Sequence, residues 1–281
     1  MKILILLGFV TLAYARSIDS NDQPFSLWGY MAKYAIPLAE EIRKAEEAQS
    51  RIVGGSISSI GQFPYQAGLL VSFPGGTGVC GGSLVNNRRV VTAAHCWNDG
   101  QSQGSSITVV LGSTTIFSGG TRLNTNSIGM HPQWTPSLAR NDIAVIYLPR
   151  TINAISLPSG TELNENFAGS SAIASGFGRI GTNIPIANNQ PLRHVTLNVI
   201  TNNVCTSSFP GLIQASNICT SGAGGVSTCV GDSGGPLVVN RPGRSILVGV
   251  TSFGHVSGCE TGFPAVFARI SSYIAFINQH W

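Results

Sequence analysis

From residue 52 onward, short apolar runs suited to β-strands alternate with stretches rich in Gly, Asn, Ser and Pro. Gln66–Val71, Ile107–Leu111 and Ile246–Val250 are examples, and each has the length of a single strand. Strands at this spacing, without long helices between them, favour an all-β barrel or sandwich. From Ile270 to Trp281 apolar residues recur at helical spacing, which predicts one closing helix packed on the body.

Two stretches ahead of this region have a different character. Residues 1–15 combine Lys2, an apolar run and a small-residue cleavage site, so we expect a secretory signal peptide. No later apolar segment is long enough for a membrane span, so a secreted, soluble protein without membrane contacts is expected. Residues 16–51 contain the one markedly charged and helix-forming stretch, Leu38–Ala48.

The charge balance narrows the choice of partners. The chain has 16 Lys and Arg against 12 Asp and Glu, a formal net charge of +4. This weak and scattered positive charge does not favour nucleic acid. Beyond Arg51 no lysine occurs, and arginine keeps its proton to higher pH than lysine does. Two explanations of this absence of lysine stay open: adaptation to a strongly alkaline lumen, such as an insect midgut, or compositional drift.

Three motifs carry residue types suited to nucleophilic catalysis. Ser233 lies in Gly-Asp-Ser-Gly-Gly-Pro, His95 in Thr-Ala-Ala-His-Cys and Asp142 in Asn-Asp-Ile-Ala-Val. A serine hydroxyl is a weak nucleophile that needs a base and a group that orients the base. The order His, Asp, Ser in these contexts resembles the chymotrypsin-like (trypsin-like) serine peptidases, and in particular insect digestive chymotrypsins. The resemblance runs from residue 51 to residue 281.

The resemblance implies a fold of two six-stranded antiparallel β-barrels with a C-terminal helix. The peptidase domain would span residues 52–281, with the first barrel at about 52–158, the second at about 159–270 and the helix at 271–281. Six cysteines in a secreted chain allow about fifteen pairings. The family pattern implies three disulfides, Cys80–Cys96, Cys205–Cys219 and Cys229–Cys259. We expect a monomer with neither cofactor nor metal.

The catalytic roles implied by the resemblance are those of the Ser-His-Asp triad that characterises this family. Ser233 would attack the scissile carbonyl, and His95 would take its proton and later deliver it to the leaving amine. Asp142 would hold the tautomer of His95. The backbone N–H groups of Gly231 and Ser233 would form the oxyanion hole.

The resemblance also implies a zymogen, with residues 16–51 as the activation propeptide. Cleavage after Arg51 by a trypsin-like protease would free Ile52, whose α-ammonium would pair with Asp232. Because no cysteine precedes Cys80, no disulfide could tether the propeptide, and it is expected to leave after activation.

Pocket positions predict the substrate class. Ser227 occupies the family's pocket-base position, where trypsin-like members carry an aspartate for Arg or Lys. Ser252, Phe253 and Gly254 would form the edge strand that pairs with the substrate backbone, with Gly254 leaving the pocket mouth open. Ala265 stands where chymotrypsins usually carry glycine, so its methyl group should narrow the pocket. Cleavage after Phe, Tyr, Leu or Met is therefore expected.

The favoured interpretation is a secreted serine endopeptidase that acts on protein or peptide substrates in digestion and meets protein protease inhibitors. Three alternatives stay open. An elastase-like peptidase is weakly favoured by Ala265 and disfavoured by Gly254. A non-catalytic homologue in an immune cascade is disfavoured because all three triad residues are present. A dedicated cascade protease is disfavoured because residues 16–51 contain no cysteine.

Overall fold

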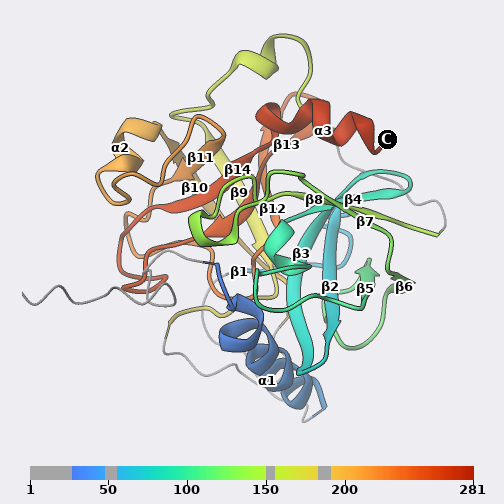
Figure 1. The fold of residues 1–281 in the computed structure, drawn as a ribbon. Helices are drawn as coiled ribbons and strands as arrows, with labels where there is room; N and C mark the ends of the chain where they lie inside the picture. The colour runs from blue at the N-terminus through green and yellow to red at the C-terminus, as the bar shows by residue number, and fades with distance from the viewer. Residues whose placement is uncertain (1–26, 48–55, 150–155, 183–190) are drawn as a thin grey trace, which may run out of the picture.

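Two curled antiparallel sheets form the body of the molecule, and helices are few and short (Figure 1). The computed structural model describes residues 27–47, 56–149, 156–182 and 191–281. This architecture confirms the predicted all-β fold with two barrels and a C-terminal helix. Among the helices of the described ranges, none combines the length and the apolarity needed to span a bilayer.

The first sheet comes from the first half of the peptidase region, in the order β6-β5-β2-β3-β4-β8-β7. Its strands are β2 (Gln66–Phe73), β3 (Gly76–Asn86), β4 (Arg89–Thr92), β5 (Ser106–Leu111), β6 (Thr121–Thr125), β7 (Ile128–Met130) and β8 (Ala144–Tyr147). The end strands β6 and β7 are separated in the chain by residues 126 and 127 only. The first sheet therefore has seven strands where six are predicted, and among the described residues its end strands β6 and β7 are not paired with each other, so it forms a half-barrel.

The second sheet has the order β1-β10-β11-β14-β13-β12-β9. Its strands are β1 (Ser56–Ile57), β9 (Ser171–Gly176), β10 (Arg193–Ile200), β11 (Asn217–Thr220), β12 (Pro236–Arg241), β13 (Arg244–Phe253) and β14 (Ala265–Arg269). Because β9 also pairs with β10, six of these strands close into a barrel. The short β1 precedes the first barrel in the chain yet pairs with β10 of the second, and the predicted domain bounds stay a prediction.

Alternation along the strands explains how the first barrel is covered. Leu69 and Val71 of β2 point into the barrel core, whereas Leu70 faces the other way, as the two-residue period of a strand requires. The outward Leu70 is nevertheless only 7% exposed, because a helix packs over it. That helix is α1 (Ile36–Glu47), which lies against β3 at the lower edge of the molecule in Figure 1.

Helix α1 corresponds to the predicted helix at Leu38–Ala48, and a π-helical turn, η1 (Met31–Ala35), leads into it. The C-terminal helix is shorter than predicted: the 3₁₀ turn η5 (Ile270–Tyr273) precedes α3 (Ile274–Gln279). The remaining short helices are η2 (Ala94–Cys96), η3 (Pro136–Leu138), η4 (Gly160–Asn164) and α2 (Asn202–Thr206). Phe276 and Ile277 of α3 join the core of the first barrel, so α3 also ties the chain end to that barrel.

The three disulfides have the pairing that the family resemblance implies. They join Cys80 to Cys96, Cys205 to Cys219 and Cys229 to Cys259. The first joins β3 to η2, and the third closes a 30-residue stretch that contains Ser233. The first and third disulfides therefore brace the segments that carry His95 and Ser233.

Candidate active site

The three predicted catalytic side chains meet between the barrels, although they come from separate parts of the chain. His95 lies in η2, directly after β4, Asp142 lies just before β8, and Ser233 precedes β12. The Ser233 turn is held by a hydrogen bond of 2.7 Å from the N–H of Gly81 to the Ser233 carbonyl. Gly234 in this turn has a φ of +79°, and an added Cβ would lie 2.5 Å from the Gly81 carbonyl oxygen. Only glycine therefore fits there.

Asp142 holds His95 through two hydrogen bonds, one to its backbone and one to its imidazole. The backbone N–H of His95 donates to Oδ1 over 2.9 Å, and Nδ1 donates to Oδ2 over 2.8 Å. Both side chains are buried. Because a carboxylate only accepts hydrogen bonds, this geometry places a proton on Nδ1 and leaves Nε2 as the atom that can accept one. This is the arrangement that a general base requires.

Ser252 supplies a third hydrogen bond to the same carboxylate. Its hydroxyl donates to Oδ2 of Asp142 over 2.7 Å, and the side chain is 2% exposed. A buried carboxylate is tolerated when its oxygens are this well satisfied. Ser252 was predicted to lie on the substrate-pairing strand, and its contact with Asp142 was not predicted. No local pattern could have revealed it, because Ser252 is 110 positions away from Asp142.

Ser233 is engaged by a side chain that the sequence analysis did not consider. Its hydroxyl donates to the phenol oxygen of Tyr30 over 2.9 Å, and the N–H of Gly231 approaches the same oxygen at 3.4 Å. The Tyr30 ring meets His95 edge-on, with 4.6 Å between ring centroids. Burial raises the pKa of Tyr30, so the phenol is neutral. Within the described ranges, no hydrogen bond joins Ser233 directly to His95.

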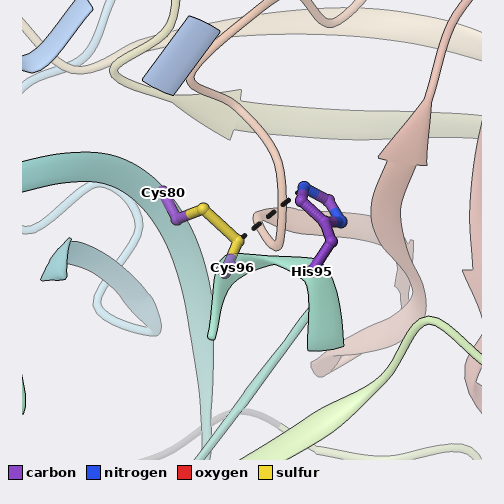
Figure 2. A group of neighbouring side chains, drawn as sticks. All are labelled: Cys80, His95 and Cys96. Carbon is purple, nitrogen blue, oxygen red and sulfur yellow. Dashed lines mark hydrogen bonds between the residues drawn. A yellow bond between two sulfur atoms is a disulfide. The ribbon is translucent and has the colours of Figure 1, made fainter. Parts of the chain in front are cut away.

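The Cys80–Cys96 disulfide lies beside His95, as Figure 2 shows. The Sγ of Cys96 is 4.0 Å from Nε2 of His95, so these three residues place possible metal-ligand atoms close together. Both sulfurs are bonded to each other, however, and a metal needs a thiolate rather than a disulfide sulfur. This cluster therefore braces η2 and is not suited to hold a metal ion.

A cavity of about 260 Å³ opens beside Ser233. Ser227, Phe253 and Gly254 line it, as predicted for pocket residues, and an added Cβ on Gly254 would meet nothing within 4 Å. No Asp or Glu is among the residues that line this cavity. Ala265 does not line it, because its side chain packs in the core of the second barrel. The narrowing effect of Ala265 stays a prediction.

Asp232 points away from this cavity and lines a second one of about 210 Å³, together with Gly178 and Thr228. Its carboxylate accepts the N–H groups of Gly178 and Cys229 over 2.8 and 2.9 Å. The residue is half-buried as a whole, but its carboxylate is enclosed by protein, and this burial raises its pKa to about 6. Among the described residues no cation forms an ion pair with it. Its predicted partner Ile52, like Arg51, lies outside the described residues.

The comparisons with known proteins agree with this geometry. A family described as Trypsin matches residues 52–277. The chain is 38% identical to a collagenase of Hypoderma lineatum over 84% of its length and 89% of that protein's length. It is 35% identical to serine protease 1 of Drosophila melanogaster over 84% and 87%. A solved structure of HL collagenase superposes with a TM-score of 0.73 at 37% identity, covering 82% of this chain and 98% of the other.

Proposed function

The chain belongs to the trypsin family of serine endopeptidases, and we propose that it is a secreted zymogen which, once cut after Arg51, cleaves peptide bonds after large apolar residues. The observation that supports the specificity is the cavity beside Ser233. Ser227, which the family resemblance assigns to the pocket base, is among its lining residues and no acidic residue is, so the cavity offers no counter-ion to Arg or Lys. A role in digestion and the encounter with protein protease inhibitors belong to the same proposal.

The residues perform the reaction in two halves. After Tyr30 leaves, Nε2 of His95 takes the Ser233 proton while Oγ attacks the scissile carbonyl, and the N–H groups of Gly231 and Ser233 stabilise the oxyanion. The imidazolium then gives its proton to the leaving amine, and an acyl group remains on Ser233. In the second half His95 takes a proton from water, which attacks the acyl carbon, and His95 then returns that proton to Oγ of Ser233 as the carboxylic acid product leaves. Asp142 holds the ring orientation throughout, through the two hydrogen bonds described above.

Activation relies on Asp232. Its enclosed carboxylate is costly while it lacks a cation, and the cavity beside it has room for a chain terminus. The α-ammonium of Ile52, freed by a trypsin-like activator, is the proposed partner. This pairing would rearrange the loop that carries both Gly231 and Ser233.

A cleavage profile tests the specificity. The protein is assayed before and after treatment with immobilised trypsin, which is then removed, on peptides that differ only before the cut: Phe, Tyr, Leu, Met, Ala or Arg. Activity that appears only after treatment and is highest for Phe, Tyr, Leu or Met supports the proposal. A preference for Ala supports the elastase-like alternative. Native collagen is also tested as a substrate, because the Hypoderma lineatum relative is named a collagenase. The Ser233→Ala protein, treated identically, controls for residual trypsin.

The assignment of the pocket base has its own test. Ser227→Asp should reduce kcat/KM for Phe substrates about a hundredfold, because an unpaired carboxylate would lie where the apolar side chain binds. The matched control is Ser227→Ala, which removes the hydroxyl without adding charge and should keep the preference for Phe. An unchanged preference in the Asp variant would show that Ser227 does not line the bound substrate side chain.

A further inference from the structure

The stretch Leu27–Glu47, called the docked segment below, lies N-terminal to the matched family domain and occupies the catalytic cleft. Its residue Tyr30 reaches Ser233 and Gly231 through one phenol oxygen and His95 through its ring. A side-chain oxygen, not a peptide carbonyl, therefore lies at the nucleophile. The docked segment blocks the site without presenting a bond to be cut.

A second set of contacts fixes the backbone on both sides of Tyr30. The N–H of Met31 donates to Oδ2 of the buried Asp99 over 2.8 Å, and the N–H of Gly29 donates to the Asp99 carbonyl over 3.3 Å. The N–H of Leu27 donates to the Pro136 carbonyl over 3.2 Å. Met31 itself is fully buried in the core of the first barrel. Tyr30 is thus held from the main chain as well as by its own oxygen.

Helix α1 forms a third anchor, on the outer face of the first barrel. Leu38, Ala39 and Ile42 are at most 1% exposed and pack with Leu70, Val79, Ile116, Phe177 and Leu192. Leu38 also reaches the Ser233 loop, since a Cβ built on Gly231 would lie 2.4 Å from its Cδ2. At the rim, Arg179 donates to both carboxylate oxygens of Glu41 over 2.9 Å. The apolar contacts bury a continuous face of the helix.

We propose that the docked segment is an inhibitor of the catalytic site that stays bound after the chain is cut after Arg51, so that activity needs its release as a second event. The inference rests on the proposed zymogen cleavage. None of the three anchors involves residues 48–55, so the cut itself breaks none of them. The Asp99 contacts and the packing of α1 on Leu70 and Val79 also lie outside the loop that the Ile52 pairing would rearrange. The cut does convert an intramolecular contact into a bimolecular one, so dilution and degradation then control release.

The first experiment separates the cut from the release in the full chain. Lys33, Arg43 and Lys44 are basic residues of the docked segment that trypsin could cut, so all three are replaced by Gln in every protein tested. Immobilised trypsin then cuts after Arg51, mass spectrometry follows the Ile52 terminus, and hydrolysis of a Phe substrate follows activity. We expect the Ile52 terminus to reach completion while activity lags behind it, and the docked segment to co-elute with the enzyme on gel filtration.

Tyr30 variants in the same background identify the blocking group. Tyr30→Ala should let activity rise in step with the Ile52 terminus, whereas Tyr30→Phe keeps the ring against His95 and should give an intermediate lag. Activity that keeps step with the cut when Tyr30 is intact would overturn the inference. Complete formation of Ile52 with no activity in any variant would instead overturn the proposed activation and leave co-elution to decide whether the segment stays bound.

A synthetic peptide spanning Leu27–Glu47 provides the second experiment, using enzyme freed of its own segment. It should inhibit hydrolysis competitively. The Tyr30→Phe peptide lacks the phenol oxygen that contacts both Ser233 and Gly231, and it should inhibit about tenfold more weakly. The Tyr30→Ala peptide lacks the whole ring and should inhibit about a hundredfold more weakly. A Leu38→Asp peptide tests the helix anchor, since it would bury an unpaired charge. Equal inhibition by all four peptides, or none by any, would refute the proposal.

Discussion

The two barrels differ in how far their parts of the candidate catalytic site are assembled. On the first-barrel side, His95 and Asp142 already have the hydrogen bonds that a general base needs. On the Ser233 side, the nucleophile is bonded to Tyr30, and Asp232 lacks a cation among the described residues. Under the proposed activation, the loop of the second barrel and the docked segment would have to change, whereas the His95–Asp142 pair is already assembled.

The largest expected effect on activity comes from disrupting the His95–Asp142 pair. Asp142→Asn replaces a carboxylate that accepts from Nδ1 of His95 with a neutral amide, so the proton no longer has a fixed place on the ring. We expect kcat/KM of the processed enzyme to fall about 10⁴-fold, a magnitude known from this same family. Hydrolysis of a Phe substrate measures the loss. A fall of less than about tenfold would show that the pair is not the catalytic base.

The Ser233 side of the site is tested through Asp232, by measuring how the free energy of unfolding of the uncut chain depends on pH. The folded pKa of Asp232 is about 6, above its ordinary value of 3.8, so the folded, uncut chain binds more protons than the unfolded chain between those values. Its free energy of unfolding should therefore fall, on the order of 3 kcal/mol, as the pH rises from about 4 to about 7. Urea unfolding of the uncut Ser233→Ala protein measures this change without self-digestion.

Two comparisons make that test specific. Asp232→Asn removes the ionisable group and should flatten this part of the pH profile, whereas an unaltered slope would assign it to other groups. Once Ile52 is freed and paired, the processed enzyme should lose the decline near pH 6. Pairing with Asp232 would raise the pKa of the Ile52 α-ammonium. The stabilisation that this ion pair gives to the folded enzyme should be complete below the ordinary amine pKa of about 8 and should be lost as the pH rises through the raised pKa.

The smallest effect concerns the support of Asp142 by Ser252. Ser252→Ala removes one of three hydrogen bonds to the carboxylate, and kcat/KM should fall roughly tenfold. Ser83→Ala is the matched control, because the Ser83 hydroxyl is also buried but has no hydrogen-bond partner in the described part of the chain. Equal effects of the two substitutions would show that the Ser252 contact contributes only packing.

Local chemistry explains why much of this site could be predicted. His95, Asp142 and Ser233 each lie in a short motif whose neighbours are recognisable without knowledge of the fold, and the cysteine pairing follows the same resemblance. The helix at Ile36–Glu47 was also predictable, because helix-forming residues and apolar spacing act over a few turns. These features depend on residues that are close together in the chain.

Contacts between distant residues account for what the motifs could not predict. Tyr30 and Ser233 are 203 positions apart, and nothing around Tyr30 distinguishes it from an ordinary apolar position. The apolar face of α1 indicates that some surface covers it, but only packing shows that this surface is the outer face of the first barrel. Likewise, Ala265 lies in the second core rather than on the cavity wall. The free energy of burial depends on which surfaces meet in three dimensions, and a linear pattern specifies an apolar face without naming its partner.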